Sequence, residues 1–245
     1  MVRPVQVSAM VAFAAFLLGT TFVEAQTPTP DELVARNVAA RGGEEKLKSV
    51  ESLRMSGTVS AQGMEMPLTL VLKRPNLVKQ EMTVQNARVV QAYDGEKAWA
   101  INPMLGPGPQ VIEGLQADAL KNQSMIDGPL VGYKQRGDSL EVVGPAEVEG
   151  AKTWKLKLTR KDGNTMHVFL DAESGLERQW SATTEQNGMK MAIDTIMGDY
   201  QPVDGVPMPR SMRTMVDGQQ VATVKMTSIE FNVPVDPSEF AMPAK

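Results

Sequence analysis

Short strand-like runs joined by tight turns dominate the second half of the chain. Seven such runs fill residues 139–232, and Asn187-Gly188 and Asp217-Gly218 stand among the turns between them. Asn-Gly and Asp-Gly between hydrophobic runs are the strongest local signal for a β-hairpin. An antiparallel meander this long has to curl into a barrel or fold into a sandwich, because a flat sheet would leave long unpaired edges. The sequence therefore predicts a mainly β fold.

Five more strands are predicted ahead of this region, at residues 53–60, 67–73, 77–84, 88–93 and 97–101. With the seven later runs they make twelve strands. Apolar and polar residues alternate along several of these strands, and successive side chains of a strand point to opposite faces. We therefore expect the sheet to have one apolar face and one polar face that contacts solvent.

A helix is predicted to precede the strands. Thr29, Pro30 and Glu32 supply an N-cap, a proline at the first helical position and the glutamate of a capping box. The glycine pair at 42–43 ends this helix, and a short second helical turn follows at residues 44–50. The predicted fold is therefore mainly β with a few helices.

Between the two groups of strands the pattern breaks, at residues 104–137. A loop rich in glycine and proline comes first, and after it Ile112, Leu115, Ala119 and Ile126 fall on one face of a predicted helix. Such a helical insert would cover the mouth of a curled sheet or, equally, patch an exposed sheet edge. The pattern leaves both interpretations open.

The N-terminus has the layout of a secretory signal peptide. A basic residue precedes an apolar stretch at residues 7–22, and Val23 and Ala25 place small residues three and one before a cleavage point. The alternative is an uncleaved anchor, but the stretch is about 16 residues long and a span needs roughly 20. We predict that residues 1–25 are removed and that residues 26–245 form a single domain in the periplasm.

Composition narrows the range of partners. The chain has no cysteine and a formal net charge of −4. Without disulfides, an exported protein has to rely on a full-sized hydrophobic core. No run of Lys or Arg marks a nucleic-acid surface, and no polybasic or amphipathic segment marks a membrane surface. We expect a soluble monomer that does not bind nucleic acid.

Residues able to carry catalysis are scarce. The single histidine, His167, falls in a predicted strand at residues 165–170, and we assign it a structural, solvent-side position. One histidine without cysteine cannot build the usual zinc sites, and no Gly-x-Ser-x-Gly motif marks a nucleophile. We therefore predict no enzyme activity, no catalytic residues, no metal and no cofactor.

Methionine supplies an unusual share of the apolar residues. The chain has 17 methionines but only three tryptophans, three tyrosines and six phenylalanines. Methionine is flexible and polarizable, so it specifies a rigid core poorly but lines an adaptable apolar surface well. The methionines therefore either fill a solid core or line a cavity for acyl chains, and composition leaves both open.

Strand phase selects the side chains that we expect to point inward and bind a ligand. They are Met55, Leu70, Leu72, Met82, Trp99, Trp154, Leu156, Trp180, Met191 and Ile193. Leu115 joins this candidate set from the helix that we expect over the opening.

Several short motifs follow one another along the chain. They are Ala40-Arg41-Gly42-Gly43, Ser52-Leu53-Arg54-Met55-Ser56-Gly57, Lys73-Arg74-Pro75, Tyr93-Asp94-Gly95 followed by Trp99 and Asn102-Pro103, and Val235-Asp236-Pro237 with Phe240 and Pro243. Together with the signal peptide, this order resembles the outer-membrane lipoprotein-sorting family, whose LolA-like and LolB-like members form a half-barrel superfamily. The resemblance spans essentially the whole mature sequence.

The resemblance implies an incomplete, strongly curved antiparallel β-barrel of about 11 strands, with helices covering a hydrophobic cavity that holds acyl chains. It also implies an arginine that locks the helical cover, for which Arg54 and Arg74 are the candidates. The expected function is a periplasmic carrier of lipid or lipoprotein acyl chains, which exchanges them with donor and acceptor proteins of the envelope membranes. The alternative is an envelope protein-interaction or stress-sensing module, whose concave face would be packed solid.

Overall fold

The computed structural model describes residues 27–186 and 189–244. The predicted signal peptide at residues 1–25 and the predicted turn at Asn187-Gly188 lie outside the described residues. Within the described part of the chain, none of the helices is long and apolar enough to cross a membrane.

Thirteen strands form one antiparallel sheet in the order β6-β5-β4-β3-β2-β1-β13-β12-β11-β10-β9-β8-β7. Their bounds are β1 Ser52–Ala61, β2 Met64–Lys73, β3 Leu77–Val84, β4 Ala87–Tyr93, β5 Ala98–Ile101, β6 Pro109–Ile112, β7 Ser139–Val148, β8 Ala151–Thr159, β9 Thr165–Asp171, β10 Glu177–Gln186, β11 Met189–Val203, β12 Val206–Val216 and β13 Gln219–Phe231. The first and last strands pair in the middle, while β6 and β7 are the free edges.

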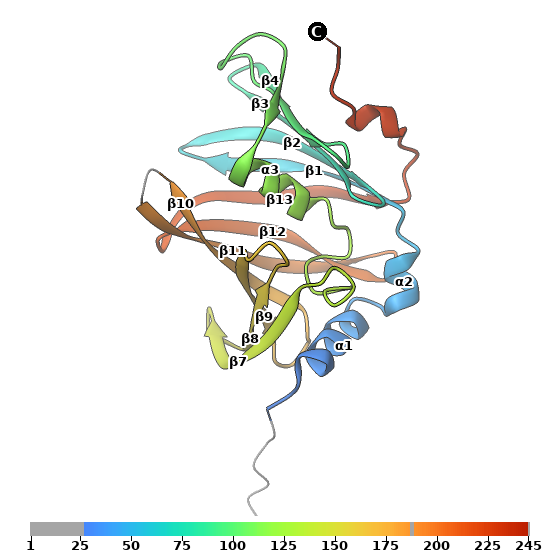
Figure 1. Ribbon diagram of the computed structural model, residues 1–245, viewed down its shortest axis with the longest axis vertical. Helices are drawn as coiled ribbons and strands as arrows, with labels where there is room; N and C mark the ends of the chain where they lie inside the picture. The colour runs from blue at the N-terminus through green and yellow to red at the C-terminus, as the bar shows by residue number, and fades with distance from the viewer. Residues whose placement is uncertain (1–26, 187–188, 245) are drawn as a thin grey trace, which may run out of the picture.

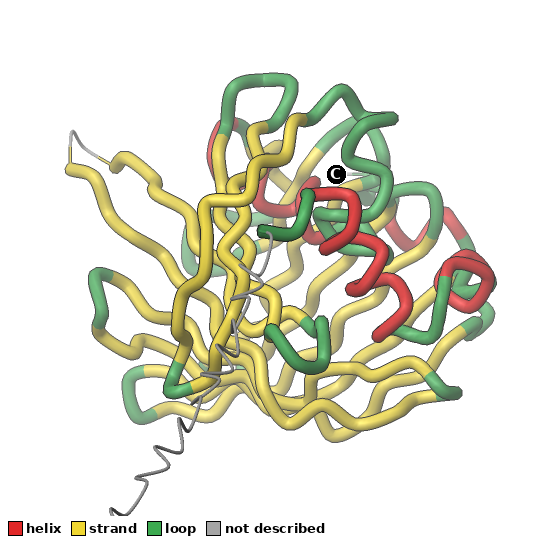
Figure 2. The backbone as a smooth tube through the Cα atoms, turned by 90° about the horizontal axis from the view of Figure 1, so that it is seen from below, coloured by secondary structure: helices red, strands yellow, loops and turns green. Residues whose placement is uncertain are grey.

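The sheet curls strongly without closing, as Figures 1 and 2 show. The predicted fold class, a mainly β incomplete barrel, is therefore confirmed. The seven runs predicted at residues 139–232 are strands β7 to β13. At the Asp217-Gly218 hairpin both turn residues have positive φ, +48° and +78°, which is the backbone that this dipeptide favours.

The strand count differs from the prediction because β6 was not expected. This strand has four residues and begins at Pro109, at the end of a segment read as an irregular loop. Proline is tolerated at the start of a strand on a sheet edge, where a missing N–H breaks no ladder. Short edge strands of this kind leave little periodicity in the sequence, so the count of twelve was one too low.

The helices are α1 Pro30–Ala40, α2 Glu44–Lys48, α3 Gly114–Gln123 and the 3-10 helix η1 Pro237–Phe240. The predicted capping box of α1 is present, because the Thr29 hydroxyl accepts from the Glu32 N–H and the Glu32 carboxylate accepts from the Thr29 N–H. The phase predicted for α3 was wrong: Ala119 is exposed, whereas Leu120 is buried. The predicted stripe began at Ile112, which belongs to β6, so it ran across a strand–helix boundary.

The insert lies on the inner side of the curled sheet, where α3, labelled in Figure 1, contacts β3, β4 and β5. The C-terminal segment covers the opposite, convex face of the same strands. There Val71 of β2 packs with Val235 and Phe240, although its neighbours Leu70 and Leu72 belong to the concave cluster. The β2–β5 region is therefore apolar on both faces.

Candidate functional site

Alternating side chains of the first three strands build an apolar cluster on the concave face. Leu70 and Leu72 point to the same side of β2, and the sheet register places Leu53 and Val78 on either side of Leu72. Leu120 of α3 packs into this group, and all five side chains are buried. The insert thus covers this cluster from the side of β3 to β5.

A second apolar cluster lies on the strands of the other half of the sheet. Leu156 of β8 and Val168 and Leu170 of β9 are buried there, together with Leu33 of α1 and Leu130 from the segment after α3. Because Leu130 joins this cluster and Leu120 the first one, a single insert spans both halves of the concave face.

Part of the concave face is only incompletely covered. Met55 of β1, Met82 of β3 and Met208 and Met212 of β12 pack against the first cluster but remain half-buried. Apolar side chains that keep some contact with water can be covered further by an apolar partner. This surface is lined by methionine, the flexible residue in which the sequence is unusually rich.

An ion pair fastens the insert to the sheet. Arg74, directly after β2, donates two hydrogen bonds of 2.6 and 2.7 Å to the Asp127 carboxylate, and the two side chains are 25% and 23% exposed. Arg74 also donates to the carbonyl oxygens of Leu47 and Val50. Arg41 adds a hydrogen bond of 2.6 Å to the Asp127 carbonyl oxygen. The segment that follows α3 is therefore held at one end by charged groups.

Of the two candidate lid-locking arginines, Arg74 is the one that contacts the insert. Arg54 lies in β1 opposite Val71 and Glu230. Because Val71 packs under the C-terminal segment, this register places Arg54 on the convex face. Sequence could not choose between them, since Arg74 and Asp127 are separated by 53 residues.

A buried polar cluster lies next to this anchor. The Glu177 carboxylate accepts a hydrogen bond of 2.9 Å from the Trp180 indole, and its carbonyl oxygen accepts one of 2.7 Å from the Tyr200 hydroxyl. Burial raises the pKa of Glu177, while the nearby Arg41 charge and the Trp180 bond oppose that rise. A Cβ added at Gly128 would lie 3.5 Å from Arg41 Nη1 and 3.6 Å from Glu177 Oε1. The insert backbone thus passes directly over this cluster.

The structure distributes the predicted ligand-binding residues over these surfaces. Buried within the two concave clusters are Leu70, Leu72 and Leu156. Half-buried against them are Met55, Met82, Trp154 and Trp180. Half-buried in β11, toward its hairpin with β10, are Met191 and Ile193. Leu115 lies in α3.

Trp99 does not point into the concave face, and that prediction was wrong. Its side chain is 2% exposed and packs with Val90 and Ala92 in a separate cluster. Its indole N–H donates a hydrogen bond of 2.8 Å to the carbonyl oxygen of Phe240 in η1. In β5 the neighbouring Ala98 takes the concave position. Trp99 therefore fixes the C-terminal segment to the convex side.

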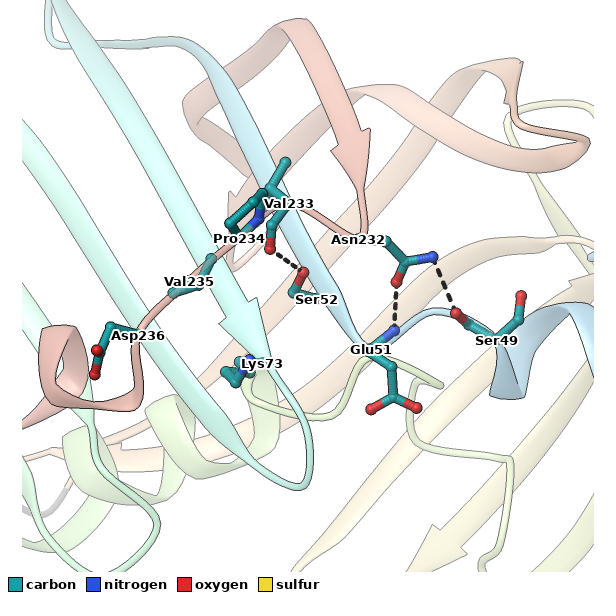
Figure 3. Close-up of a pocket in the computed structure, with 9 residues that line it drawn as sticks. All are labelled: Ser49, Glu51, Ser52, Lys73, Asn232, Val233, Pro234, Val235 and Asp236. Atoms are coloured by element: carbon teal, nitrogen blue, oxygen red, sulfur yellow. Dashed lines mark hydrogen bonds between the residues drawn. The ribbon is translucent and has the colours of Figure 1, made fainter.

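A depression of about 630 Å³ lies where the chain leaves β13 (Figure 3). Asn232 accepts from the Glu51 N–H at 2.7 Å and donates to the Ser49 carbonyl oxygen at 3.0 Å. The Ser52 hydroxyl donates to the carbonyl oxygen of Val233 at 2.7 Å. These polar groups satisfy one another, so their role is to hold the start of the C-terminal segment against β1.

His167 lies half-buried in β9, opposite Lys157 and Ser181. Burial lowers the pKa of His167, and the charges of Lys155 and Lys157 lower it further. In the described ranges, no group of three or more His, Cys, Asp or Glu side chains is arranged to hold a metal ion.

No protein-family model and no curated protein matches the sequence. Solved structures match it over most of its length. A LolA superfamily protein from Nitrosomonas europaea has a TM-score of 0.59 and 10% identity, covering 88% of this chain and 98% of its own. A DUF1329 family protein from Desulfovibrio piger has a TM-score of 0.60 and 11% identity, with coverage of 88% and 98%. An outer membrane lipoprotein-sorting protein domain from Vibrio parahaemolyticus has a TM-score of 0.53 and 10% identity, with coverage of 84% and 97%.

At this level of identity the likeness concerns the path of the backbone. The three solved structures match nearly their whole length to this chain, so the shared fold takes in most of its backbone. The same architecture was implied by the short motifs from Ala40-Arg41-Gly42-Gly43 to the C-terminal Val235-Asp236-Pro237. The chain is therefore LolA-like in fold, an open half-barrel with a helical insert on its concave face.

Proposed function

We propose that this protein is a periplasmic, non-enzymatic carrier of lipid or lipoprotein acyl chains, which bind on its concave face. The observation that carries the proposal is the incomplete cover of an apolar surface. Met55, Met82, Met208 and Met212 remain half-buried against the cluster that Leu120 of α3 joins. A surface of this kind gains free energy when an apolar partner removes it from water.

The energetics suit a carrier that tolerates different chains. Each methylene removed from water contributes about 0.8 kcal/mol, so one long acyl chain contributes about 10 kcal/mol before ordering costs. The hydrophobic term has no directional requirement, and methionine side chains adapt to the shape of the chain. Entry beneath the insert requires it to move, and such a movement breaks the Arg74–Asp127 ion pair together with the Arg41 hydrogen bond to the Asp127 carbonyl oxygen.

Two further observations support the ligand class and the compartment. One of the structural neighbours is named as an outer membrane lipoprotein-sorting domain. The leader predicted at residues 1–25 directs the chain to the periplasm, where donor and acceptor membrane proteins of the envelope are within reach.

The proposed ligand-binding set keeps residues expected from strand phase, most of which lie in or against the concave clusters, while Leu115, Met191 and Ile193 are kept from the sequence alone. It comprises Met55, Leu70, Leu72, Met82, Leu115, Trp154, Leu156, Trp180, Met191 and Ile193, with Met208 and Met212 added and Trp99 removed.

A fluorescent fatty-acid probe tests the proposal on the mature chain. Met82→Glu places an unpaired charge on the half-buried concave surface and should weaken probe binding by about tenfold or more, because a charge is costly in apolar surroundings. Met104 is 57% exposed in the loop after β5, so Met104→Glu is the matched control and should bind as the wild type does. Melting curves of both variants establish that they are folded.

The contrary result is equally clear. If the wild type binds no probe and native mass spectrometry finds no co-purified lipid, the carrier proposal fails. The protein-interaction module would then be the better description of the same fold.

A further inference from the structure

A basic pocket lies beside the insert. It has a volume of about 410 Å³ and forms where α3, the segment after α3 and the turns that follow β2 and β8 meet. Its lining includes four positively charged side chains, namely Arg74, Lys121, Arg136 and Arg160. Asp127 in the lining and the nearby Asp138 and Asp162 supply three negative charges, which leaves an excess of one positive charge among these groups.

Two of the four cations are committed to protein partners. Arg74 uses its guanidinium on the Asp127 carboxylate and on backbone carbonyl oxygens. Arg136 donates to the Asp138 carboxylate at 3.0 Å and to two carbonyl oxygens of the segment after α3. Both arginines therefore shape the wall of the pocket and have little capacity left for a ligand.

Arg160 is held less completely. Its side chain is 13% exposed, and Nη1 lies 3.8 Å from Asp138 Oδ2, beyond hydrogen-bond distance. The contact of 3.8 Å from Nη1 to the Met125 sulfur uses a weak acceptor. Within the described part of the chain, the buried Nη2 has no hydrogen-bond partner. A buried donor without an acceptor is costly, and Nη1 has only a distant carboxylate and a weak sulfur acceptor, so this guanidinium has capacity for an anion from outside the chain.

Lys121 supplies the second available cation. It lies in the last turn of α3, is exposed, and takes part in none of the ion pairs found among residues 27–186 and 189–244. Lys121 belongs to the insert and Arg160 to the turn after β8, so an anion between them would bridge the cover to the sheet.

The pocket is continuous with the apolar concave face. Ile126 lines the pocket and also packs against the first concave cluster. Met125 and Val131 add apolar lining, while Asn76 and Asn122 add neutral polar groups. A molecule with a charged head and an apolar tail would therefore find both environments within one site.

We propose that this pocket binds the phosphate of a lipid head group between Arg160 and Lys121 while the acyl chains lie on the concave face. The inference rests on the proposed carrier function and narrows its ligand to anionic phospholipids. Arginine and lysine both bind phosphate oxygens through charge-assisted hydrogen bonds, and the pocket volume is within the usual range for small-ligand sites.

Isothermal calorimetry on the mature chain tests this with three probes. These are short-chain phosphatidylglycerol, the corresponding diacylglycerol without phosphate, both below their micelle-forming concentrations, and inorganic phosphate. Phosphatidylglycerol should bind about tenfold tighter than diacylglycerol, because one charged pair is worth roughly that factor. Arg160→Gln and Lys121→Gln should each remove most of that advantage without changing diacylglycerol affinity.

Controls separate the site from general charge and folding effects. Lys161→Gln removes the same charge from the neighbouring position, which does not line the pocket, and should behave as the wild type. Arg160→Lys keeps a positive charge and should retain part of the preference. The exposed Lys121 can be replaced without disturbing the core, so its variant remains informative even if Arg160→Gln is unstable.

Each other outcome overturns the inference in a distinct way. Equal binding of the two lipids, with no effect of either variant, rejects the head-group site and leaves the carrier function standing. Inorganic phosphate that binds as tightly as phosphatidylglycerol would make this a site for free phosphate. Failure of both lipids to bind removes the carrier function and this inference together.

Discussion

The two apolar faces of β2–β5 are covered by different means. On the convex face the chain's own C-terminal segment packs down fully, with Phe240 at 0% and Trp99 at 2% exposure. On the concave face the insert is fastened by the Arg74–Asp127 ion pair, and Met55 and Met82 beside it remain half-buried. The convex cover packs through aromatic side chains, whereas the concave cover combines the buried Leu120 and Leu130 with a polar attachment.

On the carrier proposal, the convex surface is structural and the concave surface binds the ligand. Rigid aromatic side chains specify one close-packed arrangement, whereas methionine fills space adaptably. A surface that must bind and release a partner cannot be packed to the density of a core, because removing the cover would then cost too much stability. The methionines of the concave face are the composition expected of a surface that binds and releases an apolar ligand.

The largest effect is expected on the convex face. Phe240→Ala should lower the free energy of unfolding by about 3–5 kcal/mol, because it leaves a cavity among Val71 and Val235. Denaturant unfolding measures this change. Probe affinity at low temperature, where the variant remains folded, should stay at the wild-type value. Loss of probe binding by folded Phe240→Ala would erase the distinction between the two faces.

A smaller effect is expected at the anchor of the insert. Arg74→Gln leaves the Asp127 carboxylate without its charged partner and should cost about 1–3 kcal/mol. Hydrogen exchange should quicken in the cover, residues 114–137, more than in strands β1 to β4. Stopped-flow mixing should show faster probe entry. Asp127→Asn should reproduce both effects. If hydrogen exchange quickened equally in the cover and in the sheet, the ion pair would not hold the insert locally.

The smallest effect is expected at His167. His167→Ala should leave probe affinity unchanged, because the neighbouring Val168, not His167, belongs to the concave cluster. The folded-state pKa of His167 is below its unfolded value, so the unfolded chain binds the proton first and stability falls as pH drops below about 6.5. The alanine variant should lose less stability over that acid range, as unfolding measured at pH 7 and pH 5 can show. A loss of binding by folded His167→Ala would reveal a role that the fold does not suggest.

Much of the architecture was predictable because its causes are local. Asp217-Gly218 adopts the positive φ values that its hairpin requires, and the capping box at Thr29 and Glu32 opens α1 as expected. Alternation along β2 separates Leu70 and Leu72 from Val71 in the sequence and in the structure. In each case the signal lies within a few residues of the feature that it predicts.

The misassignments share another cause. Alternation assigns side chains to the two faces of a sheet, but it does not indicate which face becomes concave. The prediction therefore included Trp99 in the ligand-binding set, although Phe240 covers it on the convex face. The edge strand β6 has too few residues to show an alternating pattern in the sequence. The buried face predicted for α3 was wrong because it was counted from Ile112, which lies in β6 and not in the helix.

The sequence by itself therefore determined twelve of the thirteen strands, the Asp217-Gly218 turn and the capped helix, since these depend on neighbouring residues. Only the tertiary structure decided which apolar face is sealed, that Arg74 meets Asp127, and that Arg160 and Lys121 line one pocket. These contacts join segments far apart in the chain, and the curl of a sheet of thirteen strands brings them together. Curvature is a property of the whole sheet, and no short stretch of sequence encodes it.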